Sequence, residues 1–209
     1  MTGRIIKSQA CIEEGTQALL EMDSRFTPVL EMSGPLPLRL RPDGFSALLN
    51  AIVGQQISLA AAASVWDRLK AAGLMDATSI MDASDEDLRE CGLSRPKIRY
   101  VRALATANID YPSLRLLPDE QVISTLVTIP GIGPWTAEIY TMFSLGRADV
   151  FAPGDLALQE AARLLFNLEV RPNEKRFRQM AEMWSPWRSV AARALWAYYR
   201  VTKNREGIQ

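Results

Sequence analysis

Apolar residues recur at spacings of three and four through most of the sequence, and no stretch alternates apolar and polar residues as a half-buried strand would. Ile98, Val101 and Leu104 are one example of this spacing. The pattern predicts helices over approximately these ranges: 8–22, 45–53, 59–72, 77–82, 84–90, 95–105, 119–127, 135–144, 155–168, 173–183 and 187–202. We therefore expect an all-α fold of two helical lobes with a cleft between them.

Prolines and capping residues predict where the helices begin and where the chain is not helical. Four prolines fall within 27–42 and two within 109–118. Because proline removes a backbone donor and blocks a helix interior, both stretches are expected to be extended or looped. Asp43 and Ser58 each precede an apolar helical segment, so each is expected to cap the helix that follows it.

The composition excludes several classes of catalytic site. The chain contains no histidine, which rules out Ser-His-Asp, Cys-His and ordinary histidine–metal chemistry. Its two cysteines, Cys11 and Cys91, are too few for a zinc site or a four-cysteine iron–sulfur cluster unless another chain supplies ligands. An enzyme with this composition has to work with carboxylates, lysine, hydroxyls or backbone groups.

Charge and targeting signals give weaker constraints. The net charge is zero, but residues 76–90 carry six acidic side chains, and residues 171–205 carry nine Lys or Arg against two Glu. This segregation can present a basic face to nucleic acid, although ordinary solvated helix faces are the favoured interpretation on charge alone. The sequence has neither a signal peptide pattern nor a membrane-length apolar run, so we expect a cytoplasmic or nucleoid-associated protein.

The segment IPGIG at 129–133 predicts a tight hairpin between two helices. Pro130 ends the preceding helix, Gly131 and Gly133 permit positive φ and close backbone approach, and the next helix begins at about Pro134. Amides at the start of that helix can bind a phosphate without lysine, and the turn can direct several carbonyls at one cation. Taken alone, the segment is explained equally well as a tight connection.

Asp155 follows the segment FAPG and stands at the start of the next apolar helix. Its simplest role is an N-cap. The same position also serves chemistry, because amides at a helix start favour the ionised carboxylate. Such a carboxylate can stabilise positive charge that develops on a sugar ring, or orient a water for attack.

Together these segments resemble the helix-hairpin-helix, Gly/Pro…Asp superfamily of DNA glycosylases, and within it the alkylbase (3-methyladenine) glycosylase II branch. The matching segments are IPGIGPWTA at 129–137, FAPGD at 151–155, MWSPWRS at 183–189, ALW at 194–196, AIVGQQIS at 51–58 and GLSRPKIR at 92–99. The resemblance spans about 43–200. It implies one glycosylase domain over 1–209, in which 1–42 form an N-terminal helix and an extended segment packed on a lobe.

The resemblance also implies a reaction. Asp155 matches the catalytic aspartate, and Trp135 and Trp196 match aromatic positions that bind the substrate base. Bifunctional relatives carry a nucleophilic lysine where this chain has Trp135, so we expect base removal without strand cleavage. The expected activity is hydrolysis of the N-glycosidic bond of alkylated, cationic purines such as 3-methyladenine, during base excision repair. For Trp184, Trp187 and Trp196, helical spacing alone favours a place in the core.

Further positions match residues that contact DNA in the family. They are Gln56, which would fill the gap left by the flipped base, and Gly131, Gly133 and Thr136 at the hairpin. The backbone carbonyls of Val127, Ile129 and Ile132 match ligands of a structural monovalent cation, Na or K, that is held when DNA is bound. No other cofactor is implied. The implied partner is damaged double-stranded DNA, bound by a monomer without a membrane or an obligate protein partner. Alternatively, Gln56 satisfies a helix end.

Other functions are also compatible with the sequence. One is a helix-hairpin-helix module that binds DNA and catalyses nothing, for which Asp155 is only a cap. Another is a glycosylase for mismatched or oxidised bases, and a third is a helical interaction protein unrelated to DNA. Gly154 and Ile139 depart from residues found in some relatives, an acidic residue and a pocket tyrosine, and both departures bear on the range of bases removed.

Overall fold

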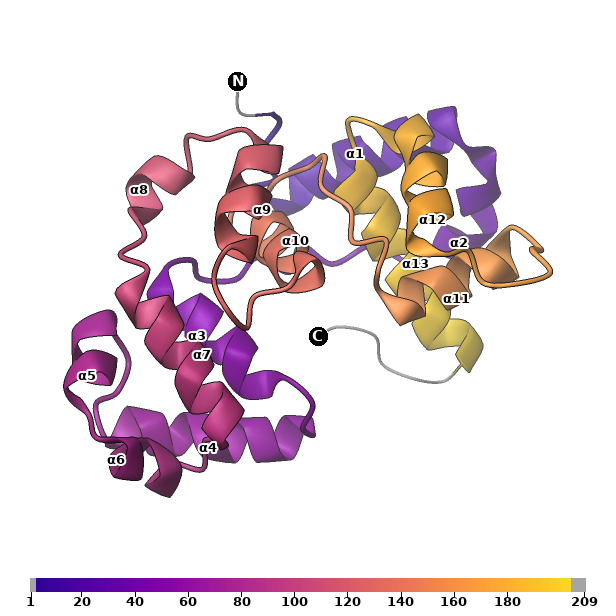
Figure 1. Cartoon of the computed structure of the whole chain (residues 1–209). Coiled ribbons are helices and arrows are strands. Elements are labelled where there is room, and N and C mark those ends of the chain that lie inside the picture. Colours follow the sequence, from indigo (N-terminus) through magenta and orange to yellow (C-terminus); the bar gives the residue numbers. More distant parts are fainter. Residues whose placement is uncertain (1–2, 204–209) are drawn as a thin grey trace. The chain divides into compact units, whose positions relative to one another are not determined.

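The computed structural model describes residues 3–203, and these residues form a helical structure (Figure 1). The α-helices are α1 Gln9–Met22, α2 Thr27–Ser33, α3 Phe45–Gly54, α4 Leu59–Ala71, α5 Ala77–Asp82, α6 Asp85–Glu90, α7 Arg95–Thr106, α8 Tyr111–Leu114, α9 Asp119–Val127, α10 Pro134–Phe143, α11 Leu156–Leu165, α12 Glu174–Ala181 and α13 Arg188–Lys203. There are also two short 3₁₀ helices, η1 Ser24–Phe26 and η2 Glu182–Trp184. Between residues 3 and 203 the β-structure amounts to one isolated bridge, Ile5 to Arg147, so the all-α class is confirmed. No helix in this range has the apolar length that a bilayer crossing requires.

Two compact units divide the chain, in agreement with the two expected lobes. The inserted unit is the continuous stretch 41–140, and the split unit combines residues 3–40 with residues 141–203 of the described chain. The division falls inside α10, between Tyr140 and Thr141. The N-terminal segment therefore belongs to the same unit as the C-terminal helices.

In the inserted unit, α7 is the central helix and packs against α3, α5 and α6. The apolar faces predicted for α3 and α7 are buried as expected. Their buried side chains are Leu48, Leu49, Ile52, Val53, Ile98, Val101, Leu104 and Ala105. Burial of one such large side chain contributes roughly 1.5–3 kcal/mol, so this contact fixes the end of α3 firmly against α7.

The two predicted N-caps of this unit have different outcomes. Ser58 caps α4 as expected, since its Oγ accepts a hydrogen bond from the Ala61 amide at 3.2 Å. Asp43 does not cap α3, because the N-cap is Gly44 with a φ of 91°. The Asp43 carboxylate instead pairs with Arg115, whose Nη2 donates to Oδ1 at 2.7 Å. This partner is distant in sequence, and it competes successfully with the local capping bond.

The two stretches predicted to be loops each contain a short helix. α2 lies within 27–42, and α8 lies within 109–118. A proline sits in the first turn of each, Pro28 in α2 and Pro112 in α8. The missing N–H of proline has no helical partner at that position, and its fixed φ suits a helix start. These prolines therefore begin helices, and the expectation of continuous loops was wrong.

In the split unit, α13 is the central helix and packs against α1, α2 and α11. Trp184 lies fully buried in an aromatic cluster, with ring centroids 5.4 Å from Phe26 and 5.7 Å from Phe151. Its indole N–H donates to Asp23 at 3.0 Å, which satisfies its one polar atom. Trp187 is buried as well, so the core interpretation of both tryptophans is confirmed.

The close approach of α1 to α13 depends on Gly15. A β-carbon added there would lie 2.5 Å from Cε3 of Trp187 and 2.8 Å from Cγ2 of Val190. Both distances are far below the roughly 3.5–4.0 Å at which carbon atoms attract one another. No side chain larger than hydrogen fits between these helices without a shift of buried atoms.

We expect Gly15→Ala to lower the free energy of unfolding by about 1–3 kcal/mol, because the added methyl group overpacks a buried contact. Urea unfolding or thermal melting measures this. Gly54→Ala is the matched control, since an added β-carbon there has nothing within 4 Å, and we expect it to be neutral or stabilising. A G15A protein that is as stable as the wild type would contradict the described packing of α1 on α13.

Candidate functional site

Asp155 occupies the N-cap of α11 in the split unit. Its Oδ1 accepts a hydrogen bond from the Leu158 amide at 2.9 Å, so the predicted capping role is confirmed. The carboxylate is 7% exposed, and its backbone amide donates to the Ala152 carbonyl at 3.1 Å. A carboxylate at this depth, aligned with the first amides of a helix, has a fixed direction and is well placed to act on positive charge.

Trp196 of α13 provides a second hydrogen bond to the same carboxylate. Its Nε1 donates to Asp155 Oδ1 at 3.3 Å, and its ring lies 5.7 Å from that of Phe143. The indole is 1% exposed, which agrees with the core interpretation of its helical spacing. The predicted contact of Trp196 with the substrate base stays a prediction. Its hydrogen bond to the Asp155 carboxylate is a contact that sequence reasoning missed.

The hairpin between α9 and α10 lies in the inserted unit and has the predicted tight geometry. The Ile132 amide donates to the Ile129 carbonyl at 3.0 Å, which closes the turn. Gly131 has a φ of 93°, and a β-carbon on it would lie 2.4 Å from Cγ of Tyr100. Gly133 has neither feature, since its φ is not positive and an added β-carbon there would meet nothing within 4 Å. Close approach therefore requires glycine at 131 only, which corrects the expectation for 133.

The first turn of α10 places its side chains in different surroundings. Trp135 is 40% exposed, whereas Thr136 is 7% exposed. Pro134 begins the helix and has no N–H to offer. The first turn of a helix carries partial positive charge, so the start of α10 is a candidate site for an anion. Thr136 is buried as a whole residue, so its predicted contact with DNA stays a prediction.

The three carbonyls predicted to hold a monovalent cation belong to Val127, Ile129 and Ile132, and all lie in or next to the hairpin turn. The Ile129 carbonyl accepts one hydrogen bond within the turn, and a carbonyl oxygen has two lone pairs. A second hairpin carbonyl, that of Gly131, is occupied by Gln55 and is not one of the predicted ligands. A set of backbone carbonyls suits a hard monovalent ion, so these residues fit the group.

Gln56 lies exposed in the four-residue connection between α3 and α4, with a φ of 57°. Its neighbour Gln55 makes the contact with the hairpin, since its Nε2 donates to the Gly131 carbonyl at 2.8 Å. Lys97 also contacts this region, and its Nζ donates to the Val53 carbonyl near the end of α3 at 2.6 Å. Sequence reasoning missed both contacts, because each joins segments that are far apart in the sequence. For the Gln-Gln pair, the spacing also does not tell which side chain faces the hairpin.

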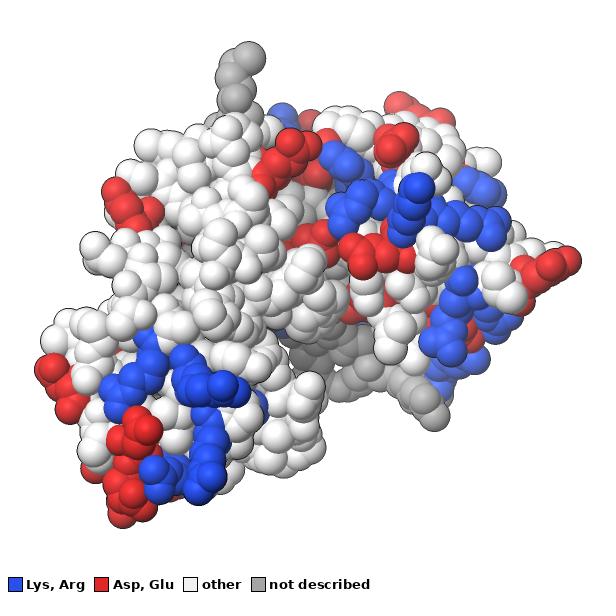
Figure 2. Space-filling view, viewed as in Figure 1, with Lys and Arg blue, Asp and Glu red and all other residues white. Residues whose placement is uncertain are grey.

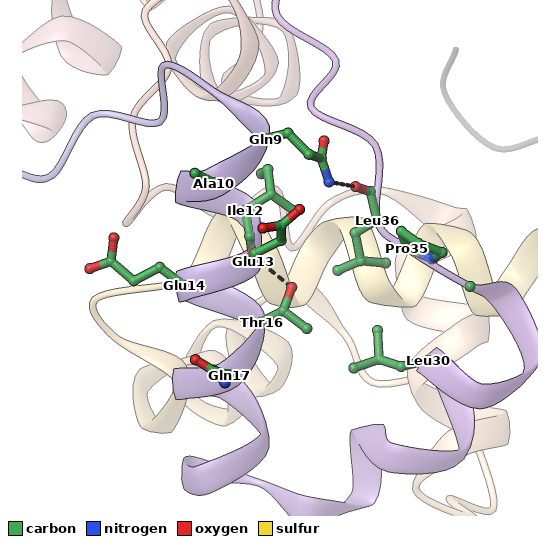
Figure 3. A pocket seen from close by; sticks show the side chains of 11 residues that line it. Gln9, Ala10, Ile12, Glu13, Glu14, Thr16, Gln17, Leu30, Pro35 and Leu36 are labelled. Atoms are coloured by element: carbon green, nitrogen blue, oxygen red, sulfur yellow. Dashed lines mark hydrogen bonds between the residues drawn. The ribbon is translucent and has the colours of Figure 1, made fainter.

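A pocket of about 630 Å³ lies in the split unit, between α1, α2 and the segment that follows α2 (Figure 3). Ile12, Leu30 and Leu36 line it together with polar side chains of α1. The Gln9 side chain spans its upper edge and donates to the Leu36 carbonyl at 2.9 Å. None of the predicted site residues lines this pocket, so its presence does not bear on the site.

Figure 2 shows Lys and Arg gathered over α6 and α7 beside acidic side chains, with a second gathering over α12. Many of the cations counted within 171–205 are paired. Arg188 contacts Asp149 at 2.7 Å, and Arg178 contacts Glu174 at 3.3 Å. Glu160 receives Arg163, Arg171 and Lys203, and the hydrogen bond from Arg163 is the main cause that lowers its pKa to about 2. This pairing favours the interpretation of solvated, ion-paired helix faces.

Comparisons with known proteins agree with the motifs. The model of the family described as HhH-GPD superfamily base excision DNA repair protein matches residues 49–186. The alkylbase DNA glycosidase-like protein mag2 of Schizosaccharomyces pombe is 27% identical over 190 residues, which cover 85% of this chain and 89% of that protein. Among solved structures, a DNA-3-methyladenine glycosidase from Bacillus halodurans has 30% identity and a TM-score of 0.83, and covers 99% of this chain and 96% of its own. A 3-methyladenine DNA glycosylase of S. pombe, solved in complex with abasic DNA, has 26% identity and a TM-score of 0.77. The match covers 94% of this chain and 100% of that protein.

We expect Asp155→Ala to lower the free energy of unfolding by about 0.5–2 kcal/mol, because the Leu158 amide loses its capping acceptor. Asp155→Asn keeps a carbonyl oxygen at the same place and should lose much less. Urea unfolding of the three proteins gives the comparison. If both variants were destabilised equally, the charge of Asp155 and not its capping bond would account for its stabilising effect.

Proposed function

Because the chain belongs to the HhH-GPD superfamily of base excision DNA repair proteins, whose model matches residues 49–186, we propose that it is a monofunctional DNA glycosylase that removes alkylated purines. The observation that carries this proposal is the buried Asp155 carboxylate, held by the Leu158 amide and the Trp196 indole. A DNA-binding module has no use for this arrangement beyond capping. The names of the relatives, which are 3-methyladenine glycosylases or alkylbase glycosidase-like proteins, support the class of base.

The proposed reaction needs little acid catalysis. A purine nucleotide alkylated at N3 or N7 is cationic, so when the bond between C1′ of the sugar and the base nitrogen breaks, the electron pair neutralises the leaving base. Positive charge develops on the sugar ring, and Asp155 stabilises it electrostatically. Water then adds to C1′ and loses a proton. This chemistry suits a chain that contains no histidine.

DNA binding is assigned to the inserted unit. The hairpin and the first turn of α10 would bind one phosphate through the backbone of Gly131, Gly133 and Thr136. The hairpin carbonyls would hold a monovalent cation against the same strand. Gln56 would enter the gap left by the flipped base, which suits its exposure and its place at the tip of a short connection. The S. pombe relative bound to abasic DNA supports DNA as the partner, and we propose that a monomer binds it in the cytoplasm or on the nucleoid.

Trp135 is the aromatic side chain that we assign to the base. It is 40% exposed, and an indole face attracts a cationic base by roughly 0.5–2 kcal/mol. Because this position holds no amine, a Schiff base with the sugar cannot form there. Trp196, buried against Phe143, is assigned to orienting Asp155.

We expect the wild-type protein to release methylated purines from methylated duplex DNA, and Asp155→Asn to lose most of this activity, about a hundredfold or more, because the transition-state charge is no longer countered. Chromatography of the released bases measures the reaction and identifies the substrates. The variant should still fold and should bind undamaged DNA like the wild type. A wild type that binds DNA but releases no base from methylated, deaminated or oxidised duplexes would refute the catalytic assignment of Asp155 and leave only its capping role.

We also expect no strand cleavage. After base release the DNA should carry alkali-labile sites without nicks, and borohydride should trap no covalent protein–DNA complex, since no lysine stands at position 135. A lysine-dependent bifunctional glycosylase, treated in parallel on its own substrate, controls for trapping. A borohydride-stable adduct of this chain would overturn the assignment as monofunctional.

A further inference from the structure

The connection between α3 and α4 is fastened to the hairpin by one side chain. Gln55 is the C-cap of α3, and its Nε2 donates to the Gly131 carbonyl at 2.8 Å, a contact across 76 residues of sequence. Both partners lie in the inserted unit. The bond is part-buried, so water competes with it less than on an open surface. The exposed Gln56 follows directly.

Helix α7 braces the same two segments from one face. Lys97 and Tyr100 lie three residues apart, so they project from neighbouring turns. The Lys97 ammonium donates to the Val53 carbonyl at 2.6 Å, and burial lowers the pKa of this lysine. The Tyr100 ring packs so closely on Gly131 that residue 131 has no room for a side chain. The end of α3, the hairpin and α7 therefore contact one another pairwise.

Gln56 has the left-handed backbone conformation, with a φ of 57°. Non-glycine residues seldom adopt this conformation, and it persists where the surroundings hold it. On its N-terminal side the holding contacts are those of Gln55 and of the end of α3. On its C-terminal side Ser58 begins α4 and caps it through the Ala61 amide. Both flanks of the exposed residue are thus fixed.

We propose that Gln55 is a positioning residue that sets the place of Gln56 relative to the phosphate-binding hairpin. This inference rests on the proposed function, because it concerns insertion of Gln56 into DNA. With the bond present, binding of a phosphate at the hairpin determines how deeply the Gln56 side chain enters the duplex and between which base pairs. Without the bond, the hairpin still binds phosphate, but the position of Gln56 relative to the base pairs is no longer fixed.

The test uses Gln55→Met, which keeps the length of the side chain and removes its donor. Gln121→Met, at an exposed position on α9 of the same unit, is the matched control. Two readouts are taken from the full-length protein at saturating concentration. One is the single-turnover rate of base release from methylated duplex and from methylated single strand. The other is the fluorescence of 2-aminopurine beside an abasic-site analogue in duplex DNA, which rises when a side chain enters the stack and needs no catalysis.

We expect Gln55→Met to slow release from duplex about tenfold, the effect of one lost hydrogen bond, and to leave release from single strand unchanged. The fluorescence rise should fall in the same variant, with wild-type affinity for undamaged duplex. In a Gln56→Ala background, Gln55→Met should have no further effect, because it acts through Gln56. The control variant should match the wild type in every readout.

Three results would overturn the inference: wild-type fluorescence in Gln55→Met, an equal loss on duplex and single strand, or an additive loss in the double variant. If Gln55→Met does not fold, Gln55→Glu, which replaces the donor with an acceptor and stays polar, takes its place. If the wild type raises the fluorescence, Gln55→Met lowers that rise and neither protein releases base, the proposed function fails while the role of Gln55 stands.

Discussion

Contact between the hairpin backbone and the ring of Tyr100 is the constraint on which the inserted unit depends. It admits only glycine at position 131, which has a φ of 93°, and the Ile132 amide closes the turn on the Ile129 carbonyl. α10 begins at Pro134, directly after this turn. The carbonyl of the same glycine remains within reach of Gln55. Gly131 thus joins the turn to α7 through Tyr100 and to the connection between α3 and α4 through Gln55.

In the split unit, a single carboxylate serves both stability and the proposed chemistry. The capping and catalytic interpretations of Asp155 are alternatives when only spacing is known, yet the structure makes them compatible. The amide and the indole that satisfy the carboxylate also fix its direction, and electrostatic catalysis requires a charge that does not have to reorient. The stability of α11 and the orientation of the site are therefore coupled, and a substitution at Trp196 affects both.

The sequence predicts most helices well, because their apolar spacing is a local property that tertiary contacts reinforce. The prediction fails where a contact with a residue distant in sequence determines the local structure. Asp43 leaves its expected capping place for Arg115, which lies 72 residues away. Pro28 and Pro112 lie in the first turns of α2 and α8. The prediction of loops was based on the exclusion of proline from helix interiors, which does not apply to a first turn. In the site, motif order locates Asp155 and the hairpin, but the contact of Gln55 and the burial of Trp196 depend on packing that no single segment encodes.

The division into an inserted and a split unit has a consequence for how the chain reaches its structure. The inserted unit, 41–140, is continuous and can complete its contacts as soon as it is synthesised. The split unit cannot, because α1 packs on α13, and these two helices are separated by nearly the whole chain. Closing so long a loop is slow, and it is entropically easier once the intervening residues are already compact. The topology thus favours a vectorial order of folding. The inserted unit, to which DNA binding is assigned, folds before the split unit, which carries Asp155.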